Sequence, residues 1–221
     1  MVIFVPKLKT MTTGIRKTIG ITGMILFLAM PSTAKITYGV KAGLGRSWMI
    51  QKLDLDYHSG PRFGYSVAAL ADIPFYRRFS FRPEIALYKQ GGYFNSQFDQ
   101  FGSPKLKYTA DYHSLQLPFD IAFTIPITGV RMAIFGGVVP DFHLWGKMNV
   151  KGIGEEPMAK QEKEMKSFDL GINSGISVEF KNIIFSINML LGTMDRRIEK
   201  IESESAVYQN NLTFSLGYIF K

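Results

Sequence analysis

The sequence contains no cysteine in its 221 residues. This absence excludes a disulfide-stapled scaffold, a cysteine nucleophile, an iron–sulfur cluster and a cysteine zinc site. It also excludes attachment of a lipid to an N-terminal cysteine. The charged fraction of 20% and the aromatic fraction of 14% are unlike those of a disordered chain. A chain of this length is expected to form one domain, for example one large β domain.

Long apolar runs are missing after residue 34. A helix that crosses a membrane needs about 20 mostly apolar residues in a row, and no later stretch has that composition. Three catalytic signatures are missing too, because the sequence has no G-x-S-x-G, no H-E-x-x-H and no phosphate-binding P-loop. We therefore expect neither helical membrane spans nor an enzyme defined by one of these motifs.

The first segment has the composition of a secretory signal peptide. Residues 1–17 are basic without any acid, residues 18–30 are almost wholly apolar, and Pro31 is followed by small residues up to Ala34. Cleavage is expected after Ala34, Met11 is an alternative start, and a single N-terminal anchor helix is the competing interpretation. Four of the 26 basic and none of the 18 acidic residues lie in this segment, so cleavage halves the net charge of +8. The basic balance therefore gives little support to nucleic-acid binding.

The remaining residues, 35–221, alternate between apolar and polar with a period of two. This pattern predicts β-strands whose two faces meet different surroundings. The segment 211–220 shows it best, with Leu212, Phe214, Leu216 and Tyr218 on one face. The alternation predicts eight strands, at residues 36–46, 62–73, 78–89, 112–125, 130–145, 168–180, 182–193 and 211–220.

The predicted connections alternate in length. Tight turns are expected near Pro74–Arg77, Pro126–Gly129 and Lys181–Asn182. Long polar loops are expected at the other end, near residues 47–61, 90–111, 146–167 and 194–207. Short periplasmic turns and longer extracellular loops are typical of outer-membrane barrels. We therefore predict an all-β fold: an eight-stranded antiparallel up-and-down transmembrane β-barrel over residues 35–221, with a cleaved signal peptide at 1–34.

The composition of the polar face decides between two kinds of barrel. A soluble, lipocalin-like barrel has an apolar interior and a polar exterior, and its strands alternate in the same way. In the last three strands the polar face consists of Gly, Ser, Asn and Thr with a few acids and no Lys or Arg. Small residues suit the crowded lumen of an eight-stranded barrel, so we expect the polar face inside and the apolar face in lipid.

Five stretches resemble the PorT-like outer-membrane β-barrel family of Bacteroidota. They are YGVKAGLGRSW (38–48), RPEIALYKQGG (82–92), YHSLQLPFDIAF (112–123), FDLGINSGISVEF (168–180) and LTFSLGYIFK (212–221). The resemblance spans the predicted mature chain and implies an eight-stranded outer-membrane barrel of a kind that is sometimes described as porin-like. One type of member is linked to protein secretion. The C-terminus also resembles the signal that the barrel-insertion machinery reads, although Lys221 follows the aromatic Phe220.

Ionisable residues on the inward parity are expected to form a polar network in the lumen. Its predicted members are Lys41, Arg82, Glu84, Asp120, Arg131, Asp141, Asp169 and Glu179, with Asp72 on the same parity. Unpaired buried charges are costly, so Arg82 and Arg131 should each lie near an acid. The alternative interpretation is a narrow ion path or a gated pore.

Aromatic residues near the strand ends predict a girdle at the lipid head groups. Its members are Tyr38, Trp48, Phe79, Phe168, Phe180, Tyr218 and Phe220. Trp48, Met49 and Ile50 are candidates for rim anchors or a partner contact.

One set of residues suggests an enzyme. His143 has the inward parity near Asp141 and Trp145, and together with Ser167 it resembles an acyl-transfer or hydrolase site at the outer rim. Against this we expect a non-catalytic protein, with no cofactor and no metal. Its function is expected to be envelope structure, or binding and secretion support through long extracellular loops. A narrow channel for ions or small solutes is the alternative, and a soluble periplasmic binding barrel ranks after it. The expected partners are outer-membrane lipid, the barrel-insertion machinery and an envelope or secretion protein.

Overall fold

The computed structural model describes residues 35–51, 59–96, 105–153, 161–163, 166–196 and 206–220. The predicted signal peptide at 1–34 lies outside the described residues. Eleven strands run in chain order: β1 Thr37–Gln51, β2 Ser59–Gly60, β3 Arg62–Tyr76, β4 Phe79–Ser96, β5 Lys105–Gln116, β6 Phe119–Ile127, β7 Val130–Ile153, β8 Gln161–Lys163, β9 Phe168–Phe180, β10 Ile183–Gly192 and β11 Val207–Phe220. No helix among the described residues is long and apolar enough to cross a membrane.

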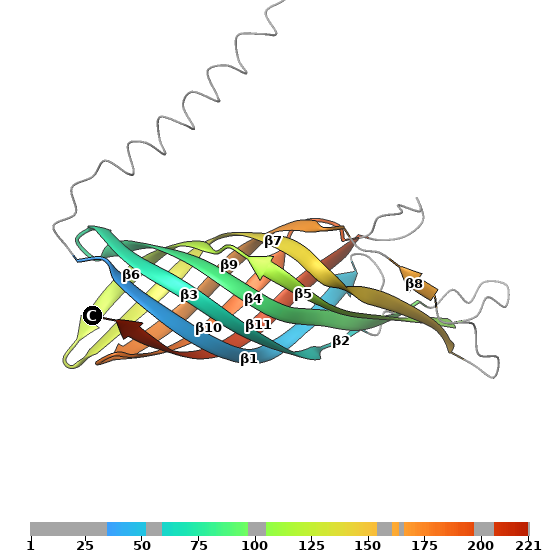
Figure 1. The fold of residues 1–221 in the computed structure, drawn as a ribbon, viewed down its shortest axis with the longest axis horizontal. Coiled ribbons are helices and arrows are strands. Elements are labelled where there is room, and N and C mark those ends of the chain that lie inside the picture. The colour runs from blue at the N-terminus through green and yellow to red at the C-terminus, as the bar shows by residue number, and fades with distance from the viewer. Residues whose placement is uncertain are drawn as a thin grey trace, which may run out of the picture. The chain divides into compact units, whose positions relative to one another are not determined.

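The strands close into an antiparallel barrel (Figure 1). Closure comes from β1, which pairs with β3 on one side and with the last strand, β11, on the other. We call each strand position in the barrel wall a stave. The strands β5 and β6 follow one another along a single stave between β4 and β7, while β2 and β8 are short strands that pair with the ends of β4 and β7. The barrel therefore has the eight antiparallel staves that the alternation predicts.

The fourth stave is divided by Leu117 and Pro118. Proline has no backbone N–H to donate to a ladder, so the regular pairing stops there. The stave nevertheless stays attached to both neighbours. The Glu84 N–H donates to the Pro118 carbonyl at 2.9 Å, and the Leu117 N–H donates to the Pro140 carbonyl at 2.9 Å.

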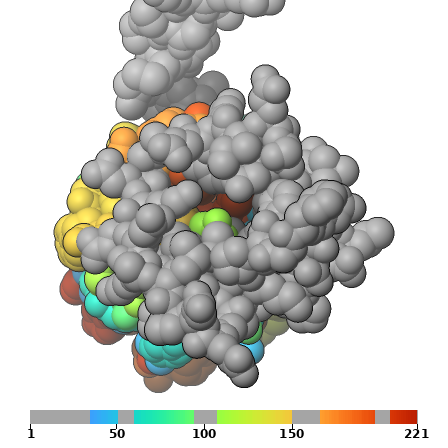
Figure 2. All heavy atoms as spheres, turned by 90° about the vertical axis from the view of Figure 1, so that its right-hand side faces the viewer, coloured from blue at the N-terminus to red at the C-terminus, as the bar shows by residue number. Residues whose placement is uncertain are grey.

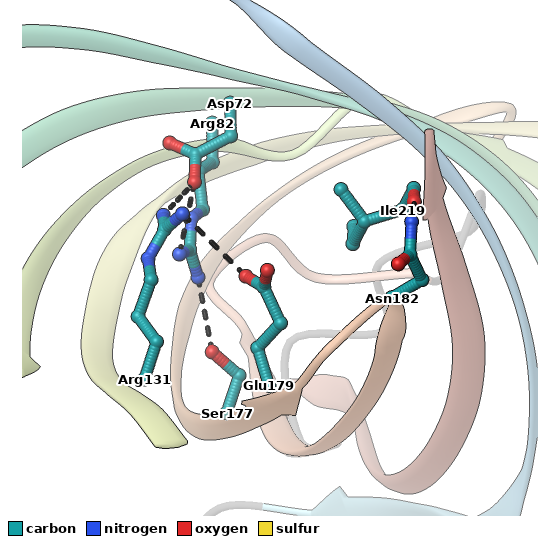
Figure 3. Close-up of polar contacts among 7 residues, drawn as sticks. All are labelled: Asp72, Arg82, Arg131, Ser177, Glu179, Asn182 and Ile219. Atoms are coloured by element: carbon teal, nitrogen blue, oxygen red, sulfur yellow. Dashed lines mark hydrogen bonds and ion pairs between the residues drawn. The ribbon is translucent and has the colours of Figure 1, made fainter. Parts of the chain in front are cut away.

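Three tight turns lie at one end of the barrel, where β1 begins and β11 ends (Figure 1). Each links two strands through two residues, as predicted, and each has a residue with positive φ: Arg77 at 42°, Gly129 at 77° and Lys181 at 54°. Positive φ matches the right-handed twist of the paired strands. The turn at Asn182 is also tied to β11, because its side-chain amide donates to the Ile219 carbonyl at 2.8 Å (Figure 3).

At the opposite end the strands run further than the sequence predicts. β1 continues to Gln51, β4 to Ser96 and β7 to Ile153, and β5 already begins at Lys105. The apolar–polar alternation fades there because, outside the lipid, the two faces of a strand no longer meet different surroundings. Backbone pairing needs no such contrast and continues. The predicted long loops are therefore partly strand, a few of their residues such as 166–167 and 194–196 are described without strand structure, and the others lie outside the described residues.

Candidate functional site

Six charged side chains from five staves meet in the half of the lumen nearest the tight turns, and Figure 3 shows four of them around Asp72. The members of this charged cluster are Lys41, Asp72, Arg82, Glu84, Arg131 and Glu179. Lys41 Nζ donates to Glu84 Oε1 at 2.7 Å. Arg82 Nη2 lies 3.2 Å from Asp72 Oδ2, and its Nη1 donates to Ser177 Oγ at 3.0 Å. Arg131 contacts Asp72 as well, and its Nη1 lies 3.5 Å from Glu179 Oε2.

The two arginines therefore share Asp72, and each lies beside an acid as the sequence predicts. Asp72 and Arg82 lie on the neighbouring strands β3 and β4, and Arg131 and Glu179 face each other on β7 and β9. The contact of Arg131 with Asp72, in contrast, joins β7 to β3 across the lumen. Arg82 and Asp72 are almost fully buried, with side-chain exposures of 8% and 5%. Burial strengthens the attraction but also removes water, so the cluster is stable only as long as every charge keeps its partner.

Asp120 lies beside this cluster, opposite Arg82 on the paired strand. Its Oδ2 accepts a hydrogen bond from the Asn173 amide at 2.9 Å, whereas its Oδ1 is buried without a partner. Asp120 and the members of the charged cluster other than Arg131 line a cavity of about 10 Å³. That volume holds about one water molecule.

The middle of the lumen is held by amides instead of ion pairs. Gln90 and Gln116 both donate to Asp141 Oδ2, at 2.7 and 3.1 Å. Asn211 donates to Gln90 Oε1 at 2.6 Å and so links this layer to β11. A second cavity of about 10 Å³ lies next to Gln116. Asp141 is therefore separate from the charged cluster, although it was predicted as part of one network.

Towards the loop end the lumen is filled by an apolar and aromatic layer. Met49, Tyr112, Met148 and Val207 pack together and are 5% exposed or less. The hydroxyl of Tyr112 donates to Gln209 Oε1 at 3.0 Å. Figure 2 views the barrel from this end and shows atoms of β5 and β11 at its centre. Met49 was a candidate for a rim anchor or a partner contact, but it lies on the inward face of β1 and is buried in this layer.

Arg196 joins this layer from outside the strands. The segment after β10 folds back, because the Met194 N–H donates to Asp169 Oδ1 and the Arg196 N–H donates to the Val207 carbonyl. The guanidinium lies 5.2 Å from the centre of the Tyr112 ring and is fully buried. Asp169 thus binds the returning chain and faces Asp141 across the β7–β9 ladder.

The enzyme interpretation depends on His143, Asp141 and Ser167. The His143 ring stacks on Tyr112, with ring centres 5.1 Å apart, and its Nδ1 is buried without a hydrogen-bond partner. The bonded oxygen of Asp141 is occupied by the two glutamines. Ser167 meets His143 through the backbone, where the His143 N–H donates to the Ser167 carbonyl at 2.7 Å. No hydrogen bond joins these three side chains as a catalytic relay requires.

Trp145 corrects a prediction. Strict alternation places it inside with His143, but β7 carries a β-bulge against β5: His143 pairs with Ser114 and Trp145 with His113, which leaves Leu144 unpaired. The extra residue reverses the parity. Trp145 is therefore 56% exposed on the outer face.

The outer face is apolar, and the predicted girdle residues lie on it at both ends. Tyr38, Phe79, Phe180, Tyr218 and Phe220 are exposed near the turn end. Phe168 is exposed near the loop end, and Trp48 is partly buried there. The sequence did not reveal Tyr112, Gln90, Gln209 or Arg196 as lumen residues. For the first three, the apolar–polar alternation was the one sign in the sequence that they face the lumen. Arg196 had no such sign because it comes after the end of β10.

Among the described residues no group of three or more His, Asp or Glu side chains is placed to hold a metal ion.

The family model described as "outer membrane protein beta-barrel domain" matches residues 30–195. The chain belongs to this family. Its members form β-barrels in the outer membrane, which fits the closed barrel, the buried polar lumen and the exposed apolar face. No curated protein sequence matches the chain.

Solved structures show the same fold at low sequence identity. A major outer membrane protein from Thermus thermophilus has a TM-score of 0.52 and 12% identity, over 85% of this chain and all of that one. Ail, the attachment invasion locus protein of Yersinia pestis, has a TM-score of 0.45 and 14% identity, over 85% of this chain and all of that one. The outer membrane enzyme PagL has a TM-score of 0.45 and 9% identity, over 80% of this chain and 97% of that one. Similarity at this level concerns the fold alone.

Proposed function

We propose that this outer-membrane barrel is non-catalytic and has a closed lumen, and that it serves envelope structure, or binding and secretion support, through its loop end. The tight turns face the periplasm and the longer connections face outwards, as in other barrels of this architecture. Export by the signal peptide at 1–34 and insertion by the barrel-assembly machinery belong to this proposal. The role in secretion support follows from the resemblance to the PorT-like family of Bacteroidota.

The filling of the lumen carries the proposal. Ion pairs occupy the turn half, amides the middle and an apolar layer the loop half, and two cavities between the described residues of the lumen have about 10 Å³ each. An eight-stranded barrel leaves just enough room for its own side chains, so solutes have no continuous path. Function is then left to the surface, and the loop end is the part that meets molecules outside the cell.

Two observations favour the second candidate, a narrow channel for ions or small solutes. Most residues that line the two cavities are polar or charged, although each cavity also has apolar lining residues, and the cavities lie in neighbouring layers of the lumen. A rearrangement of the charged cluster would connect them. The two candidates differ in whether the resting barrel conducts.

The first test is gel migration of the protein from a detergent-extracted outer-membrane fraction, boiled and unboiled. A closed barrel in that fraction shifts its mobility on boiling. A protein that is soluble in the periplasm and shows no shift contradicts the proposal and favours the soluble binding barrel.

The second test is single-channel conductance in a planar bilayer. The native protein should show no conductance. The double variant Lys41→Ala with Glu84→Ala should show conducting events, because it removes two of the side chains that fill the lumen. Leu44→Ala with Ile85→Ala is the matched control, because these outward residues lie on the same two strands. Steady conductance of the native protein would favour the channel. A lipid acyl-hydrolase activity that His143→Ala abolishes would overturn the non-catalytic part.

A further inference from the structure

The outer face changes abruptly from apolar to polar on one side of the barrel. An apolar row crosses β3, β4, β5 and β7 at Val67, Leu87, Leu115 and Phe142. The next outward row towards the loop end consists of Tyr65, Lys89, His113 and Trp145, each paired with the next across the strands. Polar groups therefore enter the outer face within one row on this side, although Phe63, the next outward residue of β3, is apolar and exposed.

The second row is an aromatic band with direct contacts. The hydroxyl of Tyr65 lies 3.2 Å from His113 Nε2, and the His113 ring stacks on Trp145 with ring centres 4.9 Å apart. Aromatic side chains with one polar edge collect where hydrocarbon meets lipid head groups. The band therefore marks the level of the outer head groups.

Basic residues surround this band. We call them the rim cluster: Arg46, Arg62, Lys89, Lys107 and Lys147, with Asp111 as the acid among them. Asp111 Oδ2 lies 3.2 Å from Arg62 Nη2, and Asp111 Oδ1 lies 3.5 Å from Lys89 Nζ. Gly91 lies opposite Asp111 on β4, the strand between β3 and β5. Arg62 and Lys89 contact Asp111, and among the described residues of this side of the rim the basic side chains outnumber the acidic ones.

The opposite side of the barrel has no such cluster among the residues that the structure describes. The outward residues of β9 and β10 remain apolar up to the loop end, at Phe168, Leu170, Met189 and Leu191. Basic residues that only keep the rim in water would be spread around it. Among the described residues, the exposed basic side chains gather on β1–β7, whereas the β9–β10 side has Lys166 before β9, which is tied to the Asp195 carbonyl. This imbalance favours a ligand on the β1–β7 side.

We propose that the rim cluster binds the phosphate groups of lipids in the outer leaflet. Phosphate is the anion that arginine and lysine bind most readily at this level of a membrane, and the charge is complementary. The aromatic band and the apolar row beneath it provide a surface for the sugar or acyl part of the same lipid. The inference rests on the proposed orientation, in which the loop end faces outwards.

The test measures lipid binding to the purified mature barrel in a neutral detergent, by native mass spectrometry. The probes are lipid A with two phosphates and the same lipid after removal of its phosphates. The native barrel should bind the phosphorylated form about tenfold tighter or more. The triple variant Arg46→Gln, Arg62→Gln, Lys89→Gln should lose this preference.

The matched control is Arg77→Gln, Arg78→Gln, Lys181→Gln, which removes two arginines and one lysine from the turn end. It should keep the preference. Equal binding of both lipids, or equal loss in both triple variants, would overturn the inference. The inference would also be overturned if inorganic phosphate, at the same concentration as the lipid, abolished lipid binding. The rim cluster would then be a site for free phosphate and not for lipid phosphate.

The mobility shift on boiling shows whether a negative result refutes only the lipid site or also the proposed function. A barrel that shifts, lies in the outer membrane and shows no preference refutes the lipid site alone. A protein that neither shifts nor lies in the outer membrane refutes the proposed function as well. If the triple variant does not assemble, Lys89→Gln alone should weaken phosphorylated-lipid binding, and unchanged binding would overturn the inference.

Discussion

The two faces of the same strands follow opposite rules. On β10, Ser186 and Asn188 point inwards and are buried, whereas Ile183 and Phe185 point outwards and are exposed. In a soluble barrel the same alternation places the apolar residues inside. The alternation along a strand therefore shows that its two faces have different surroundings. The residue types on the polar face show whether that face lies inside or outside the barrel. Here the enclosed face pairs most of its charged groups through ion pairs and amides, and the exposed face is mainly apolar.

The largest effect is expected from leaving one charge alone on the inner face. Lys41→Met removes the partner of Glu84, whose side chain is 9% exposed. Breaking a buried pair in this way costs about 3–5 kcal/mol of the free energy of unfolding. Urea unfolding in lipid vesicles, followed by tryptophan fluorescence, measures the loss.

The double variant Lys41→Met with Glu84→Leu is the control. It removes both charges and should regain most of the stability, because no unpaired carboxylate remains. A double variant as unstable as the single one would mean that packing, and not charge, holds this part of the lumen.

A charge added to the outer face should have the next largest effect. Ile172→Arg and Ile187→Arg place a guanidinium in lipid, which costs about 2–4 kcal/mol near the midplane. We expect both variants to fail to assemble, seen as loss of the form that shifts on boiling in the outer-membrane fraction. Ile172→Leu and Ile187→Leu should assemble normally. Normal insertion of both arginine variants would show that the two faces have been assigned the wrong way round.

The smallest effect is expected from one hydrogen bond inside. Ser177→Ala removes the acceptor of Arg82 Nη1, but Arg82 keeps its contact with Asp72. The loss should be about 1 kcal/mol in the same unfolding measurement. Ser174→Ala, on the exposed face of the same strand, should change nothing. A loss as large as that of Lys41→Met would mean that Ser177 holds the whole charged cluster in place.

Much of the fold could be predicted because it repeats. Alternation, the three tight turns and the inward parity of Lys41, Arg82 and Glu179 follow from a period of two and from glycine or polar residues at the turns. Strand ends could not be predicted in the same way. Beyond the membrane β4 and β7 keep their backbone ladders without keeping a pattern in their side chains.

By itself, then, the sequence determined which residues face inwards, how many staves there are and which face meets lipid, because each depends only on neighbours along a strand. The tertiary structure alone decided that Arg82 and Arg131 share Asp72, that Met49 and Arg196 fill the loop half of the lumen, and that Trp145 turns outwards at a bulge. These features depend on how staves far apart in the chain meet across the lumen. That arrangement is set by closure and register, which no single strand encodes.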